Sequence, residues 1–170
     1  DAYAEQARGL SQGGVDFLLI ETMSDLGEAR AAIEGTRRAS DLPVICTFSF
    51  DTHGRTMMGT RPAQVAREIS SLVEGIGANC GRDPEEYPAL LRSMADTLHE
   101  LSLDGTVLWA KPNAGIPHVE GDEVVYDASP EQMGRIAREL VAAGARVVGG
   151  CCGTTPAHVR AMAEALGNQP

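Results

Sequence analysis

The sequence predicts an α/β fold in which the strands of a parallel sheet alternate with helices. Short apolar runs begin near residues 15, 43, 76, 106 and 146, and a helical pattern lies between each run and the next. A repeat of roughly 30 to 40 residues is the length of one βα unit. The runs are almost continuously apolar, which is typical of strands buried on both faces of a parallel sheet. We therefore expect the helices to lie on the outside of a curved sheet.

The helix boundaries in the first half of the chain follow known start and stop signals. Gly13 and Gly14 form a usual helix stop, Ser24 or Asp25 can cap the second helix, and Pro62 suits the first turn of the third. These signals predict helices over 2–12, 26–38 and 62–73, and strands over 15–21, 43–50 and 76–80.

The second half continues the same alternation. Gly115, Pro117 and Gly121 indicate a loop after the fourth strand, and Thr154 or Thr155 can cap the last helix. The predicted elements are helices over 84–101, 130–143 and 155–166, and strands over 106–111 and 146–149. An open doubly wound sheet is the alternative arrangement, but no strand is followed by a glycine-rich nucleotide-binding fingerprint.

Composition excludes several classes of function. The chain has 170 residues, 43% hydrophobic and 22% charged, which is typical of one soluble globular domain. Its net charge of −10 argues against a nucleic-acid partner, because phosphate binding needs clustered basic residues. No apolar run approaches the roughly 20 residues that cross a bilayer. The N-terminal residues contain no initiating methionine and no signal-peptide pattern, so we expect a cytoplasmic chain that begins within a larger polypeptide.

Polar and reactive side chains fall where the predicted strands end. In parallel α/β folds, functional sites form at the carboxyl edge of the sheet. Because all five predicted strands end in polar or reactive residues, we expect these residues to form a single site. The residues at these endings are Glu21 and Thr22, Ser49 and Asp51, Asn79 and Cys80, Asn113, and Cys151 with Cys152.

The cysteines allow three interpretations. Cys151 and Cys152 stand between glycines at a strand-to-helix turn, and adjacent cysteines rarely form a disulfide with each other. Together with Cys80 they could supply three thiolates and leave one metal position open, as at a catalytic zinc. An ordinary buried pair and a redox pair are the alternatives. Cys46 lies inside a strand and is expected to be a small core residue.

Four segments carry a family resemblance. GGCCGTTPAHVRAM, together with GANC, LLIET and KPNAG, resembles the homocysteine S-methyltransferase family, which includes the homocysteine-binding module of cobalamin-dependent methionine synthase and betaine–homocysteine methyltransferase. The resemblance runs from the first strand to the last helix. It implies a (β/α)8 TIM-type barrel in which Cys80, Cys151 and Cys152 bind Zn²⁺ at the carboxyl mouth. The thiol of homocysteine would take the fourth position as a thiolate and receive a methyl group, which gives methionine.

The resemblance also implies roles for three further residues. Glu21 matches an acidic residue that holds the amino group of homocysteine, although a strand-end glutamate can instead cap the next helix. Asn79 precedes the first zinc ligand and is expected to orient it. Asn113 is expected to line the substrate pocket, and a turn-forming role competes with that assignment.

The chain departs from the family in its number of strands. A complete barrel has eight βα units, and the sequence predicts five strands. We therefore expect residues 1–170 to form the C-terminal part of a barrel, with the first three units supplied by an N-terminal segment or by other chains. The methyl donor is left open among methylcobalamin or a folate on another module, S-methylmethionine and a betaine. The alternative functions are a non-catalytic zinc subunit that presents a thiolate to a methyl-carrying partner, and a metal-free domain with structural cysteines.

Overall fold

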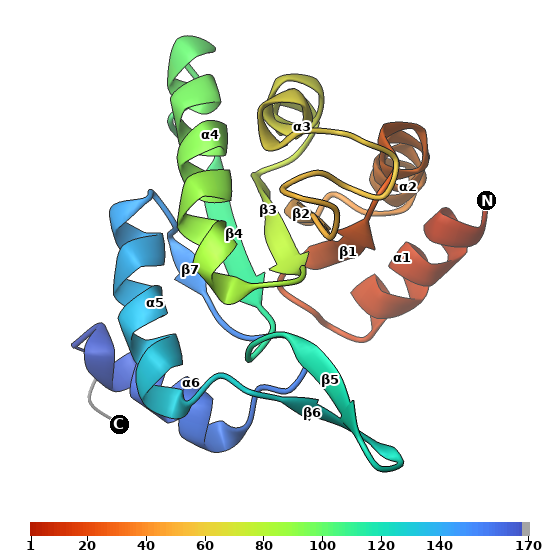
Figure 1. Cartoon of the computed structure of the whole chain (residues 1–170). Helices are drawn as coiled ribbons and strands as arrows, with labels where there is room; N and C mark the ends of the chain where they lie inside the picture. Colours follow the sequence, from red (N-terminus) through yellow and green to blue (C-terminus); the bar gives the residue numbers. More distant parts are fainter. Residues whose placement is uncertain (168–170) are drawn as a thin grey trace.

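A sheet of five parallel strands forms the centre of the computed structural model, which describes residues 1–167 (Figure 1). The first four strands of the sheet lie side by side in chain order. The fifth strand, which comes last in the chain, pairs with the fourth. The predicted parallel α/β sheet is therefore confirmed. Its strands, in spatial order, are β1 (Leu18–Met23), β2 (Val44–Phe48), β3 (Gly75–Cys80), β4 (Val107–Pro112) and β7 (Val147–Val148).

The helices begin within one residue of the predicted starts, except that the helix predicted from residue 84 opens with a 3₁₀ turn and becomes α-helical only at Tyr87. The side chain of Asp25 accepts a hydrogen bond from the Glu28 N–H, and Thr155 and His158 form a capping box at the last helix. No helix among residues 1–167 is long and apolar enough to cross a membrane. The α-helices are α1 (Ala2–Gln12), α2 (Leu26–Ala39), α3 (Pro62–Ile69), α4 (Tyr87–Glu100), α5 (Pro130–Ala142) and α6 (Pro156–Ala165), with 3₁₀ turns at Ser70–Leu72 and Pro84–Glu86.

One face of the sheet builds the hydrophobic core against the helices. Alternate strand residues such as Phe48, Ile76 and Leu108 are buried there with helix residues that include Leu91 and Leu140. Cys46 belongs to this face and is fully buried, as predicted. Burial raises the pKa of its thiol to about 12, so Cys46 is an inert core residue.

The other face of the sheet carries the remaining alternate residues of the strands. Phe17 and Trp109 meet there edge to face, with their ring centroids 5.4 Å apart. Gly77 lies under Trp109, and a Cβ atom at position 77 would come within 2.0 Å of the Trp109 carbonyl oxygen. The glycine therefore permits the close approach of β3 and β4 on this face.

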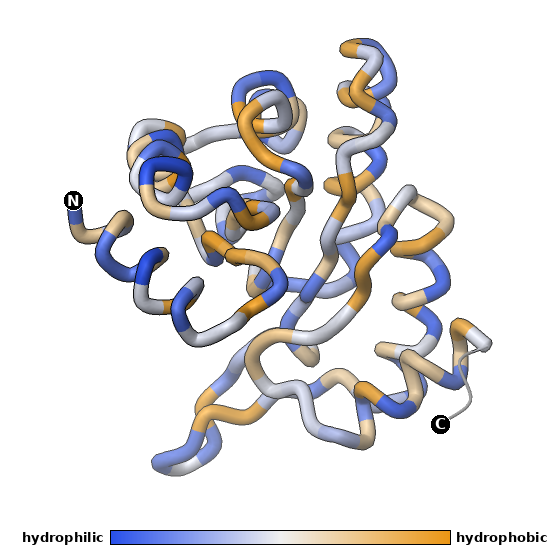
Figure 2. Tube along the Cα trace, turned by 180° about the vertical axis from the view of Figure 1, so that it is seen from behind, coloured by the Kyte–Doolittle hydropathy of each residue, from blue (hydrophilic) through white to orange (hydrophobic). Residues whose placement is uncertain are grey.

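The segment after β4 differs from the prediction. Sequence patterns indicate a loop, but the structure contains an antiparallel hairpin of β5 (Pro117–Glu120) and β6 (Glu123–Tyr126). Glu120 pairs with Glu123, which leaves Gly121 and Asp122 as a two-residue turn. The hydrophilic turn projects away from the sheet (Figure 2). β5 is fully exposed and β6 is half-buried only at Val125 and Tyr126, so no continuous buried apolar face marks the hairpin in the sequence.

Candidate metal centre

Cys80 ends β3 in an unusual backbone conformation. Its φ angle is +56°, and Thr22 at the end of β1 has a φ of +64°. Such angles are uncommon for residues other than glycine and cost about 1 to 3 kcal/mol each. The Tyr87 hydroxyl donates a 2.7 Å hydrogen bond to the Cys80 carbonyl oxygen and holds the turn. The surrounding structure therefore keeps the Cys80 sulfur pointed toward the carboxyl mouth of the sheet.

The loop after β7 places the other two cysteines. The Cys151 N–H donates to the Pro112 carbonyl oxygen at 2.8 Å, and the Ala114 N–H donates to the Cys152 carbonyl oxygen at 2.9 Å. The loop is thus bonded on both sides to the segment that follows β4. A Cβ at Gly150 would lie 2.2 Å from the Thr154 hydroxyl oxygen, and one at Gly153 would lie 2.2 Å from Cγ of Tyr126. Both glycines are required for the loop to take this path.

The three sulfur atoms converge. All three lie within 4.8 Å of one another. The Cys80–Cys152 and Cys151–Cys152 Sγ separations are 3.9 and 4.0 Å, and the Cys80–Cys151 separation is 2.8 Å. Four sulfurs bound tetrahedrally at the usual Zn–S distance of about 2.3 Å lie about 3.8 Å apart. The two separations that involve Cys152 are already close to this value. The Cys80–Cys151 separation has to lengthen by about 1 Å for a metal to bind between the three sulfurs.

The thiol pKa values of Cys80 and Cys151 are shifted in opposite directions. Burial, reinforced by the neighbouring Cys151 sulfur, raises the pKa of the Cys80 thiol. Burial also acts to raise the pKa of Cys151, but hydrogen bonds from Cys80 and Asn79 outweigh it and lower that pKa. Cys151 therefore ionises more readily than Cys80, and the thiolate is the form that binds a metal.

Asn79 connects the cluster to the rest of the sheet. Its side chain is fully buried, and its amide oxygen accepts from the Thr22 N–H at 3.1 Å and from the Thr47 hydroxyl at 2.7 Å. The amide nitrogen donates to the Thr22 hydroxyl at 2.7 Å and toward the Cys80 sulfur at 3.5 Å. One side chain thus fixes the end of β1 and faces two of the sulfurs.

Asn113 bonds to the backbone in both directions. Its amide nitrogen donates to the Gly81 carbonyl oxygen at 2.9 Å, and its oxygen accepts from the Cys152 N–H at 3.0 Å. Asn113 therefore joins the turn after Cys80 to the loop of Cys151 and Cys152. This placement gives it a framework role at the predicted site.

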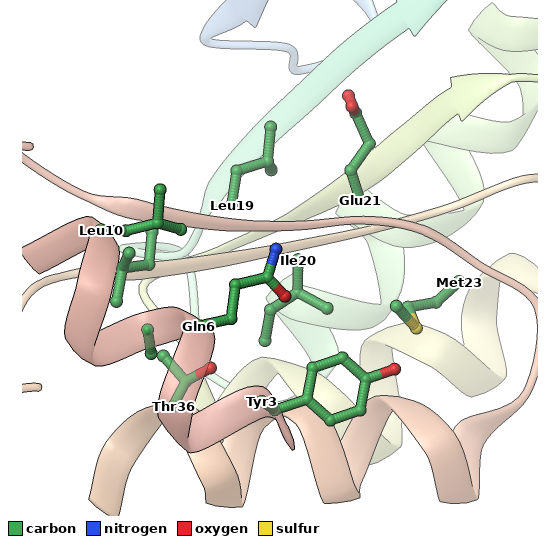
Figure 3. A pocket seen from close by; sticks show the side chains of 10 residues that line it. Tyr3, Gln6, Leu10, Leu19, Ile20, Glu21, Met23 and Thr36 are labelled. Carbon is green, nitrogen blue, oxygen red and sulfur yellow. The ribbon is translucent and has the colours of Figure 1, made fainter. Parts of the chain in front are cut away.

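Glu21 lies in β1, on the side of that strand that faces away from α1 (Figure 3). Its carboxylate forms an ion pair with the ammonium group of Lys111 at the end of β4. Glu21, Asn79, Asn113 and the three cysteines therefore all lie at or near the carboxyl edge of the sheet.

Sequence reasoning missed Lys111, Tyr87 and Tyr126. Tyr126 at the end of the hairpin packs against Gly153, and burial raises its pKa, with the charge of the nearby Cys152 sulfur adding to the shift. Lys111 alternates with Trp109 in the run TVLWAK, so the period of the strand could have assigned it to the open face. Neither tyrosine has such a signal, because each reaches the site from a separate element.

Comparison with known proteins identifies relatives across the chain. Residues 1–166 match the profile of the family described as homocysteine S-methyltransferase. The methionine synthase of Mycobacterium tuberculosis is 35% identical over 99% of this chain, which spans only 14% of that relative's length.

Solved structures show the same fold. The homocysteine methyltransferase MmuM from Escherichia coli, in its apo form, superposes with a TM-score of 0.70 at 25% identity and covers 96% of this chain. Its metallated form gives a TM-score of 0.65 at 26% identity. This chain corresponds to 56% of the apo MmuM chain. The structural neighbours are TIM-barrel enzymes, so the predicted fold class is confirmed.

Proposed function

The chain belongs to the homocysteine S-methyltransferase family, and we propose that it carries the zinc-binding part of a site that methylates homocysteine to methionine. The observation that carries this proposal is the convergence of the Cys80, Cys151 and Cys152 sulfurs from two separate strand ends. A conserved fold alone does not specify a reaction, so the cysteine geometry is the stronger support.

The donor set fits zinc. Three cysteine sulfurs with the fourth position open are the arrangement of a catalytic rather than a closed structural zinc. Two of the sulfur–sulfur separations, 3.9 and 4.0 Å, match a tetrahedral site. Asn79 donates toward the cluster from its own amide, which orients the Cys80 sulfur and offsets part of its negative charge.

The chain's own residues would then prepare the nucleophile. Bound zinc supplies the positive charge that lets a substrate thiol bind as a thiolate near neutral pH. The three anionic cysteine sulfurs keep that substrate sulfur electron-rich, so no general base is needed at the moment of transfer. A new S–CH₃ bond forms as the bond between the methyl group and the donor breaks, and the donor keeps the electron pair.

Two residues would position the substrate. We assign Glu21 to the ammonium group of homocysteine, because its carboxylate is on the same sheet edge as the cysteines and already binds an ammonium group. Asn113 holds the Cys152 loop at the rim of the same site, and its contact with the substrate is part of this proposal.

The barrel would be completed at the free edge of β1. A cavity of about 280 Å³ separates this strand from α1 (Figure 3). Four consecutive residues of β1, Leu18 to Glu21, line the cavity. Because successive side chains point to opposite faces, a lining of consecutive residues follows the strand's edge rather than a face. We propose that a parallel strand from a preceding segment or another chain pairs here and that the first three βα units of the barrel adjoin it.

A non-catalytic zinc subunit is the second candidate. The chain spans 14% of the length of the Mycobacterium tuberculosis methionine synthase, so other modules of such a protein could carry the methyl donor. Methylcobalamin or a folate on another module is the donor that this similarity favours.

Methionine formation distinguishes the two candidates. Zinc-loaded protein is mixed with homocysteine and, separately, with methylcobalamin, a methylfolate, S-methylmethionine and betaine. Methionine produced with one free donor supports the enzyme. Zinc and homocysteine binding without turnover, rescued only by a methyl-carrying partner, supports the subunit. Absence of homocysteine binding to zinc-loaded protein contradicts both.

A further inference from the structure

An ion pair crosses the open face of the sheet beside the cysteine cluster. Its partners, Glu21 and Lys111, are 90 positions apart in the sequence. They stand on β1 and β4, which are separated in the sheet by β2 and β3. The pair therefore spans the mouth of the site rather than joining neighbouring strands.

Lys111 also lies against the loop that carries the cysteines. Its Cγ and Cδ atoms are 3.5 and 3.6 Å from the position that a Cβ at Gly149 would occupy. In the sheet register it is the partner of Asn79, which donates toward the Cys80 sulfur. The side chain of Lys111 is 20% exposed and that of Glu21 is 39% exposed. The lysine is thus the more enclosed partner, and it lies next to both segments that carry the sulfur cluster.

Two opposite charges beside a thiol-binding centre match the two charges of an α-amino acid. An incoming zwitterion can replace each half of the existing pair, with its ammonium group on Glu21 and its carboxylate on Lys111. One charge-assisted contact is then exchanged for two. The flexible four-carbon stem of lysine permits the small movement that this exchange needs.

We propose that Lys111 binds the α-carboxylate of the thiol substrate and so restricts the site to amino-acid thiols, an assignment that rests on the function proposed above. An aminothiol without a carboxylate, with its ammonium group on Glu21, would separate Glu21 from Lys111 and leave the enclosed lysine ammonium without an anionic partner. Losing a partner from a partly desolvated ion pair is unfavourable. Lys111 is therefore a specificity-determining residue, and the resting ion pair disfavours aminothiols that lack a carboxylate.

Binding measurements on zinc-loaded intact protein test this assignment. Isothermal titration calorimetry compares L-homocysteine with 3-mercaptopropylamine, which lacks only the carboxylate. Lys111→Met removes the charge and keeps most of the side-chain length, and Lys111→Arg keeps the charge. Arg30→Met is the matched control, because Arg30 forms a comparable ion pair with Glu68 at 3.1 Å on the helical surface, away from the cysteines. Zinc content is measured for each variant.

The expected results differ between the two thiols. Lys111→Met should weaken homocysteine binding by roughly tenfold to a hundredfold, the usual effect of losing a charge-assisted hydrogen bond. Binding of 3-mercaptopropylamine should be unchanged or tighter. Lys111→Arg should restore most of the homocysteine affinity, and Arg30→Met should change neither.

Three outcomes overturn the assignment. Equal weakening of both thiols would mean that Lys111 only shapes the site. Tighter homocysteine binding in Lys111→Met would mean that the lysine merely obstructs it. If the unaltered protein binds zinc but no homocysteine, the proposed function itself is wrong, and the assignment of Lys111 is rejected together with it.

Discussion

Asn79 and Thr22 exchange two hydrogen bonds across the ends of β3 and β1. The Thr22 N–H donates to the Asn79 amide oxygen at 3.1 Å, and the Asn79 amide nitrogen donates to the Thr22 hydroxyl at 2.7 Å. Both Thr22 and the neighbouring Cys80 have positive φ angles. The asparagine therefore ties a strained strand end to the residue that presents the first sulfur.

Replacing Asn79 by leucine should destabilise the metal-free protein by about 1 to 3 kcal/mol, because the buried Thr22 and Thr47 groups lose their partners. Urea unfolding measures the change. Thr22→Val removes one of these bonds and should cost less. In a double-mutant cycle the two losses should be markedly less than additive, and simple additivity would show that the pair is not coupled.

Gly153→Ala should disturb the cysteine loop. Its φ is +75°, and an added Cβ would meet Cγ of Tyr126 at 2.2 Å. We expect zinc affinity to fall at least tenfold, as measured by competition with a chelator, because Tyr126 and Cys152 have to move apart. Gly14→Ala is the matched control, since its φ is +80° and no atom lies within 4 Å of the added Cβ. Equal effects of the two variants on zinc affinity would contradict a steric cause.

The stability of the metal-free protein should depend on Glu74 at acid pH. Burial acts to raise the pKa of Glu74, but hydrogen bonds from the Val44 N–H and from Arg37 outweigh it and hold the pKa below its ordinary value. A carboxyl group whose pKa is lowered by folding stabilises the protein above its unfolded pKa, and this contribution is lost as the pH falls through the folded pKa.

Glu74→Gln should therefore lower stability at neutral pH and flatten its decline below about pH 4.5, the ordinary value for glutamate. Urea midpoints measured between neutral and acid pH test this. Glu100→Gln, which removes a carboxylate from the exposed pair with Arg67, serves as the control. Identical pH profiles for Glu74→Gln and the unaltered protein would refute the expectation.

The sequence predicted the sheet and the cysteine cluster for a common physical reason. Buried parallel strands leave long apolar runs, and their reactive residues gather at the runs' carboxyl ends. The gathering of Cys80 with Cys151 and Cys152 followed from that rule together with the flanking glycines. Strand ends were the least certain part: the second strand was expected to reach Phe50, and β2 ends at Phe48.

Other features required the three-dimensional structure. The β5–β6 hairpin is largely exposed, so its only sequence signal is the Gly121–Asp122 pair that forms the turn. Lys111 resembles an ordinary solvent-facing lysine in the sequence, and its partner Glu21 is three strands away. Asn113 bonds to the backbone of Gly81, which precedes it by 32 residues, and to that of Cys152, which follows it by 39 residues. Contacts of this range have no local pattern.

The metal content of purified protein and its cysteine variants tests the central claim most directly. We predict about one zinc per chain, together with the intense thiolate-to-metal absorption of a tetrahedral sulfur site when cobalt replaces zinc. Cys80→Ser, Cys151→Ser and Cys152→Ser should each lose most of the metal, whereas Cys46→Ala should retain it because Cys46 is buried in the core. Full zinc occupancy in any of the three serine variants, or no zinc in the unaltered protein, would contradict a shared three-cysteine site.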